Sequence, residues 1–250
     1  MTIPAETIIL AAFIAFCRIG SCFMFMPGFG SARIPMQVRL FLAFAATGAL
    51  LVHLWDRILP FVDARPQILG PMIVSELLIG ALIGMVARFY MLALHFIGAA
   101  IAMLIGHSAM SGMSIEESEP QAPLSSLISL SALLLLFVFD FHHQIVKALV
   151  ASYQVAPLDV VFNPQAALID VTDALAESFL LVLRLGSPFI AYAILVNLTI
   201  GFVNKLTPQI PIYFISLPFV IAGGLVIFYF GVGMLLSLFA DGFLATTIGG

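Results

Sequence analysis

Few side chains in this sequence have the types and spacing that could carry out chemistry, and the adjacent His142 and His143 are the first to consider. Imidazole nitrogens bind zinc, usually within a set of four protein ligands in a structural site. Neighbouring residues on a helix point about 100° apart. No Cys or further His lies close by in the sequence to complete such a set. We therefore expect no metal site here and no cofactor.

Motifs of covalent or phosphoryl-transfer catalysis are absent from the sequence. There is no P-loop, no HExxH, no GxSxG and no paired CxxC. Cys17 and Cys22 lie five residues apart in an apolar segment, and we expect two buried free thiols. We predict no catalytic residue and no enzyme.

Charged residues inside apolar runs form a second group, because one charge at the middle of a bilayer costs roughly 2.5–3.5 kcal/mol. Arg88 and Asp140 both lie in such runs. In an antiparallel hairpin centred near residue 115, Arg88 lies level with His142, one turn from Asp140. We predict a buried charge pair of Arg88 with Asp140, with one of the two histidines beside it. The alternative is that residues 140–143 form an aqueous loop between two short helices.

Residues 201–221, GFVNKLTPQIPIYFISLPFVI, interrupt an apolar region with a charge and three prolines. Proline lacks a backbone N–H and breaks a helix. Pro208 and Pro211 therefore predict a turn over residues 204–211 between two helical arms. Buried non-helical backbone is tolerated only against protein or water. Polar groups that suit such a setting are Asn204, Lys205, Thr207 and Gln209.

The elements that position these residues are apolar helices. The chain has 250 residues, of which 62% are hydrophobic and 9% charged, and a soluble domain of this size does not need so much apolar surface. A helix needs about 20 residues to cross a hydrocarbon core of about 30 Å. The apolar runs cover residues 5–26, 37–55, 72–106, 124–157, 165–203 and 210–240. We predict an all-α membrane protein without a nucleic-acid partner, since the net charge is −4 and no basic cluster is present.

The third and fourth of these runs are longer than a single span requires. Residues 72–105 contain no proline and no polar loop, which predicts one continuous helix about 50 Å long. Residues 124–156 are equally uninterrupted, and the polar stretch 106–123 joins the two. We expect a long hairpin whose ends leave the lipid and which other proteins surround.

Small residues repeat at helical spacing along the first arm of this hairpin. Gly80 and Gly84 lie between Glu76 and Arg88 on an i, i+4 ladder, and a second ladder runs through Gly98, Ala102 and Gly106. Glycine at this spacing lets another helix approach closely, so Gly80, Gly84, Gly98 and Gly106 predict helix packing faces.

The sequence also indicates how two of the helices begin. Asn163-Pro164 offers an N-cap residue followed by proline at the first helical position. The first 20 residues carry Glu6 and no positive n-region, and Arg18 interrupts their apolar run. We therefore expect a retained first helix and not a signal peptide.

Four stretches together resemble the FliR family, the flagellar biosynthetic proteins of the type III export gate. NKLTPQIPIYFISLPF (204–219) resembles the proline–glutamine signature of that family, with Lys205 where arginine is usual. The other three stretches follow in family order, and the resemblance covers effectively the whole chain. They are PGFGSARIPMQVRLFLAF (27–44), ELLIGALIGMVARF (76–89) and LLLLFVFDFHHQIVKALVASYQVAPL (133–158).

The resemblance implies a fold and a role. Residues 1–158 would form a FliP-like part and residues 159–250 a FliQ-like hairpin. The chain would join FliP-like and FliQ-like subunits in a closed helical spiral whose lumen carries unfolded export substrates. An FlhB-like switch protein would dock on the spiral. The location would be the bacterial inner membrane within the flagellar basal body, with some surface against lipid.

The resemblance also implies two functional segments. One is a pore plug loop made of Met110, Ser111, Gly112, Met113 and Ser114. The other is a subunit-interface turn made of Asn204, Lys205, Pro208, Gln209 and Pro211. Two alternatives stay open: the equivalent subunit of a virulence injectisome, and a small-solute secondary transporter with proline-broken helices.

Overall fold

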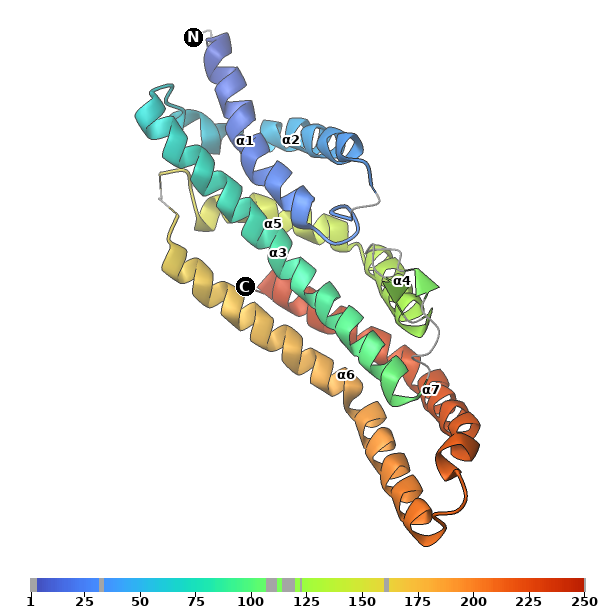
Figure 1. The fold of residues 1–250 in the computed structure, drawn as a ribbon. Helices are drawn as coiled ribbons and strands as arrows, with labels where there is room; N and C mark the ends of the chain where they lie inside the picture. Colours follow the sequence, from blue (N-terminus) through green and yellow to red (C-terminus); the bar gives the residue numbers. More distant parts are fainter. Residues whose placement is uncertain are drawn as a thin grey trace. The chain divides into compact units, whose positions relative to one another are not determined.

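The computed structural model describes residues 4–31, 34–106, 112–113, 120–121, 123–159 and 162–249. The predicted all-α class is confirmed (Figure 1). The helices are α1 (Ala5–Phe25), α2 (Met36–Ile58), the short 3₁₀ helix η1 (Leu59–Phe61), α3 (Pro66–Leu104), α4 (Pro123–Val138), α5 (Phe141–Val155), α6 (Pro164–Leu206) and α7 (Ile212–Gly249). Two strands of two residues each, β1 (Gly112–Met113) and β2 (Pro120–Gln121), pair antiparallel.

The long helices are apolar enough to cross a membrane. Among the described residues, five helices meet the length and hydropathy of a span, or six if α4 and α5 together make one. The protein is therefore a multi-pass membrane protein, as the composition predicts.

Several local predictions are confirmed. Helix α3 runs without interruption through the predicted region, although it begins earlier and contains Pro71 in its first turns. The Oδ1 atom of Asn163 accepts hydrogen bonds from the backbone N–H groups of Gln165 (3.0 Å) and Ala166 (3.3 Å) at the start of α6. A turn separates α6 from α7, drawn in orange in Figure 1, but it covers residues 207–211 and not the predicted 204–211, because residues 204–206 still belong to α6.

The prediction of one uninterrupted helix over residues 124–156 is wrong. Helix α4 ends at Val138 and α5 begins at Phe141. Between them Asp140 adopts the left-handed conformation, with φ 56° and ψ 33°. This conformation costs most L-residues about 1–2 kcal/mol, and Asp tolerates it better than most because its short polar side chain can bond locally. The two shorter helices of the alternative are therefore present.

The contacts divide the chain into two compact units. The first comprises Met1–Tyr90, Asp140–Leu175 and Leu244–Gly250. At its centre α1 packs against α2, where the rings of Phe16 and Phe44 meet edge to face with centroids 6.4 Å apart. An Nη1 atom of Arg57 in α2 donates to the carbonyl oxygen of Val150 in α5 (3.4 Å).

The second unit comprises Met91–Phe139 and Ala176–Phe243. Within it the C-terminal half of α3 contacts α6, where Phe96 stacks on Phe179 with centroids 6.3 Å apart. Helices α6 and α7 join where the Tyr192 hydroxyl donates to the carbonyl oxygen of Val220 (2.7 Å). Each unit thus contains segments from both predicted parts of the chain, residues 1–158 and residues 159–250.

Candidate functional site

A buried ion pair joins Arg18 and Glu76 within the first unit. The Nη2 and Nε atoms of Arg18 donate to the two carboxylate oxygens of Glu76 at 2.6 and 2.7 Å. The side chains are 0% and 1% exposed. Two parallel charge-assisted hydrogen bonds fix the geometry of such a pair as well as its energy. The pair therefore ties α1 to α3.

The same guanidinium also binds α5. An Nη1 atom of Arg18 donates to the Ser152 hydroxyl (3.1 Å), and Nη2 donates to the carbonyl oxygen of Ala156 (2.8 Å) just after the helix ends. The guanidinium carbon lies 3.9 Å from the centre of the Tyr153 ring, a cation–π contact. Arg18 thus joins three helices that lie far apart in the sequence.

Glycines one and two turns after Glu76 allow this close approach. A Cβ atom on Gly80 would overlap the carbonyl oxygen of Arg18 and the hydroxyl of Ser21. A Cβ on Gly84 would lie 2.6 Å from the carbonyl oxygen of Cys22. Backbone atoms cannot move aside cheaply, so larger residues here would push α1 and α3 apart and stretch the ion pair.

The second glycine ladder lies in the other unit. A Cβ on Gly98 would lie 3.0 Å from the hydroxyl of Ser125 in α4, and that hydroxyl donates to the carbonyl oxygen of His95 (3.4 Å). Gly106 follows the end of α3 with φ +76°, and a Cβ on it would lie 3.3 Å from Leu217 in α7. All four predicted packing glycines thus lie at or within contact distance of another helix.

The structure does not bring Arg88 and Asp140 together. Arg88 is exposed, the Asp140 side chain is 66% exposed, and no ion pair joins them among the described residues. The assumed register is the physical reason. A hairpin centred at residue 115 would pair Ser125 with Ile105, but Ser125 contacts His95, ten residues earlier. A shift of ten residues moves the position expected opposite Arg88 from His142 to about residue 132, away from Asp140.

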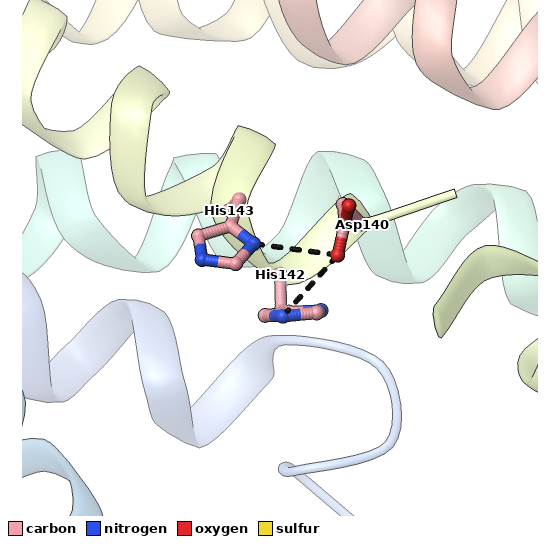
Figure 2. A group of neighbouring side chains, drawn as sticks. All are labelled: Asp140, His142 and His143. Carbon is pink, nitrogen blue, oxygen red and sulfur yellow. Dashed lines mark ion pairs between the residues drawn. The ribbon is translucent and has the colours of Figure 1, made fainter. Parts of the chain in front are cut away.

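Asp140 instead faces the two histidines that follow it (Figure 2). Its Oδ1 atom lies 3.8 Å from Nε2 of His142 and 3.4 Å from Nδ1 of His143. The imidazole centroids are 4.4 Å apart. The ligand atoms of the three residues lie within 4.8 Å of one another. The sequence argument that the two imidazoles point apart is therefore wrong for the first turn of α5.

The predicted interface turn is solvent-accessible in the single chain. Its members Asn204, Lys205, Pro208, Gln209 and Pro211 are all exposed. The backbone N–H of Ile210 donates to the carbonyl oxygen of Thr207 (3.2 Å), which closes the turn locally. The polar side chains are thus directed to surroundings outside the chain.

Most of the predicted plug loop lies outside the described residues, namely Met110, Ser111 and Ser114. Gly112 pairs with Gln121 and Met113 with Pro120 in the short antiparallel ladder between α3 and α4. Where the loop points stays a prediction.

Just before α3, in the segment between two candidate spans, Arg65 binds Asp63. The Nε atom donates to the carboxylate at 2.8 Å. Hydrogen bonds from the Arg65 side chain and backbone lower the pKa of Asp63 to about 2. The ionised Asp63 carboxylate stabilises the folded chain at any pH above its ordinary pKa. This stabilisation is lost as the pH falls from the ordinary pKa through the lowered one.

Sequence reasoning missed the pairing of Arg18 with Glu76, although both residues carried a signal. Arg18 is a cation within the apolar run of the first helix, and Glu76 is an acid at the head of a glycine ladder. A buried charge needs an opposite partner. Matching these two would have required knowing that the ladder faces α1.

Comparison with known proteins places the chain in a family. The model of the family described as bacterial export proteins, family 1, matches residues 9–246. The flagellar biosynthetic protein FliR of Caulobacter vibrioides is 31% identical over 220 residues, covering 87% of this chain and 86% of the relative. FliR of Aquifex aeolicus is 26% identical over 235 residues, covering 90% and 86%. FliR of Escherichia coli is 26% identical over 199 residues, covering 80% and 75%. The chain therefore belongs to the bacterial export proteins, family 1, the family to which the FliR resemblance pointed.

Proposed function

We propose that this chain is a non-enzymatic structural subunit of the flagellar protein export apparatus, helping to form the inner-membrane gate through which unfolded flagellar substrates pass. The observation that carries the proposal is the family match over residues 9–246, together with relatives that are named flagellar biosynthetic proteins. These names favour the flagellar system over a virulence injectisome. A solute transporter has no such support.

The surface of α6 and α7 is consistent with a subunit inside an assembly. Large aromatic side chains of α7 are between 64% and 78% exposed in the single chain, namely Tyr213, Phe214, Phe219, Tyr229 and Phe230. Burying apolar surface is worth about 25 cal/mol per Å², so such a surface is stable only against lipid or protein. The polar turn at Lys205 and Gln209 lies at one end of this surface and is unsuited to lipid.

We further propose that FliP-like and FliQ-like subunits cover much of this surface, and that an FlhB-like protein binds near the turn. In this arrangement residues 1–158 act as the FliP-like part and residues 159–250 as the FliQ-like hairpin. The segment around Met110–Ser114 would narrow the closed lumen.

The test uses a strain of the source bacterium from which the gene for this chain is deleted. Restoring the intact chain should restore swimming in soft agar. An affinity tag on the chain should recover FliP-like and FliQ-like proteins from a mild detergent extract. A deletion strain that swims normally, or a functional tagged chain recovered always alone, would refute the proposal. Loss of effector secretion with normal swimming would assign the chain to an injectisome.

A further inference from the structure

We propose that Asp140, His142 and His143 form a binding site for one divalent transition-metal ion such as Zn²⁺. The three side chains lie in the first unit, at the start of α5 (Figure 2). Nitrogen from two imidazoles and oxygen from one carboxylate make the mixed donor set that Zn²⁺ and its neighbours prefer.

The carboxylate of Asp140 does not cap helix α5, although Asp140 directly precedes that helix. An Asp before a helix normally accepts hydrogen bonds from the first backbone N–H groups. Here Asp140 makes no side-chain cap, and only its carbonyl oxygen accepts the N–H groups of His143 (2.9 Å) and Gln144 (3.2 Å). The left-handed backbone of Asp140 turns the carboxylate toward the imidazoles instead.

The separations fit an ion better than direct hydrogen bonds. Oδ1 of Asp140 lies 3.4 Å from one imidazole nitrogen and 3.8 Å from the other. Nitrogen–oxygen hydrogen bonds are mostly 2.7–3.2 Å long. Two ligands that each lie about 2.0–2.2 Å from one zinc ion are separated by roughly 3.3–3.6 Å in a tetrahedral centre. The 3.4 Å separation lies in that range, and a rotation of the His142 ring would bring the 3.8 Å separation into it.

The site is open on one side. The side chains of Asp140 and His143 are 66% and 67% exposed, and that of His142 is 36% exposed. An ion can therefore enter, and water or a group from a bound partner can take the fourth position. A bound ion would stabilise Asp140 in its left-handed conformation and so fix the break that precedes α5.

The experiment titrates Zn²⁺ into the full-length chain, purified in detergent without a polyhistidine tag, and follows binding by calorimetry. We expect one strong site per chain. His143→Gln should weaken binding by at least about tenfold, and so should Asp140→Gly, which removes the carboxylate while keeping a residue suited to the left-handed conformation. Circular dichroism confirms that each variant keeps its helices.

His53→Gln is the matched control, because His53 is an exposed histidine on α2 outside the cluster. It should leave the affinity unchanged. Should Asp140→Gly lose its helices, Asp140→Asn replaces it, since Asn also tolerates the left-handed conformation. Equal Zn²⁺ affinity in wild type and in folded His143→Gln, or no strong site in the wild type, would overturn the proposal. Neither result would bear on the role in export, which swimming measures separately.

Discussion

Removing one member of the Arg18–Glu76 pair should destabilise the chain severely. Arg18→Met leaves the carboxylate of Glu76, which is 1% exposed, without its cation, and leaves the carbonyl of Ala156 without the guanidinium donor. Breaking a buried pair in this way costs about 3–5 kcal/mol. Folded domains are stable by only about 5–15 kcal/mol, so roughly a fifth or more of the total is at stake.

The double variant separates pairing from simple packing. Arg18→Met with Glu76→Leu removes both charges and fills the space with apolar atoms, so it should be more stable than the two single effects added together. Because the residues are in direct contact through two hydrogen bonds, we expect a coupling energy of about 2–3 kcal/mol. Arg18→Lys should fall between, since it keeps the charge and loses the forked geometry.

The assay is thermal unfolding of the purified chain in detergent, followed by the fraction that remains monodisperse. For chains of 150–250 residues each kcal/mol shifts the midpoint by about 2–4 °C, so each single variant should lose on the order of 10 °C. Arg88→Met is the control, because Arg88 is exposed, and it should change the midpoint little. Additive single effects, or a loss for Arg88→Met as large as for Arg18→Met, would refute the reasoning.

Three further results are expected. Gly80→Ala should lower the same unfolding midpoint, because the added Cβ would overlap α1. Gly48→Ala in α2 is the control: its added Cβ has nothing within 4 Å, so the change should be neutral or slightly stabilising. Equal effects of the two changes would contradict the close approach of α1 and α3. Lys205→Glu should reduce swimming at normal protein level if the turn binds a partner. Lys147→Glu, at an exposed position of α5, should not. Normal swimming of Lys205→Glu would count against the interface. Shortening residues 109–117 should let small ions leak across the membrane while export continues, and a gate that stays tight would make the segment a mere connector.

Local signals predicted several of the helices and some of their ends. The proline pair around Gln209, the Asn163 cap and the uninterrupted run of α3 each act within a few residues, so one sequence is enough to read them. The packing glycines also gave a local signal, because glycine at i and i+4 lets another helix approach closely, and α1 lies against Gly80 and Gly84.

Features that depend on distant partners could not be read in the same way. The guanidinium of Arg18 meets an acid 58 residues later and a hydroxyl 134 residues later, and nothing in the sequence states which face of α1 meets which face of α3. The break at Asp140 was missed for a different reason. Its surroundings, FVFDFHH, contain neither Pro nor Gly, and the local tolerance of Asp for a left-handed backbone is too weak a signal to end a helix alone.

The buried ion pair has a consequence for synthesis. Ribosomes add about 5–20 residues per second, so the 58 residues between Arg18 and Glu76 take roughly 3–12 seconds to make. During that interval α1 carries a cation whose acidic partner does not yet exist. Inserting such a charge into lipid costs roughly 2.5–3.5 kcal/mol, which the apolar residues of α1 must offset by themselves. The order of elements along the chain therefore leaves Arg18 without its acidic partner until α3 emerges and brings Glu76 to it.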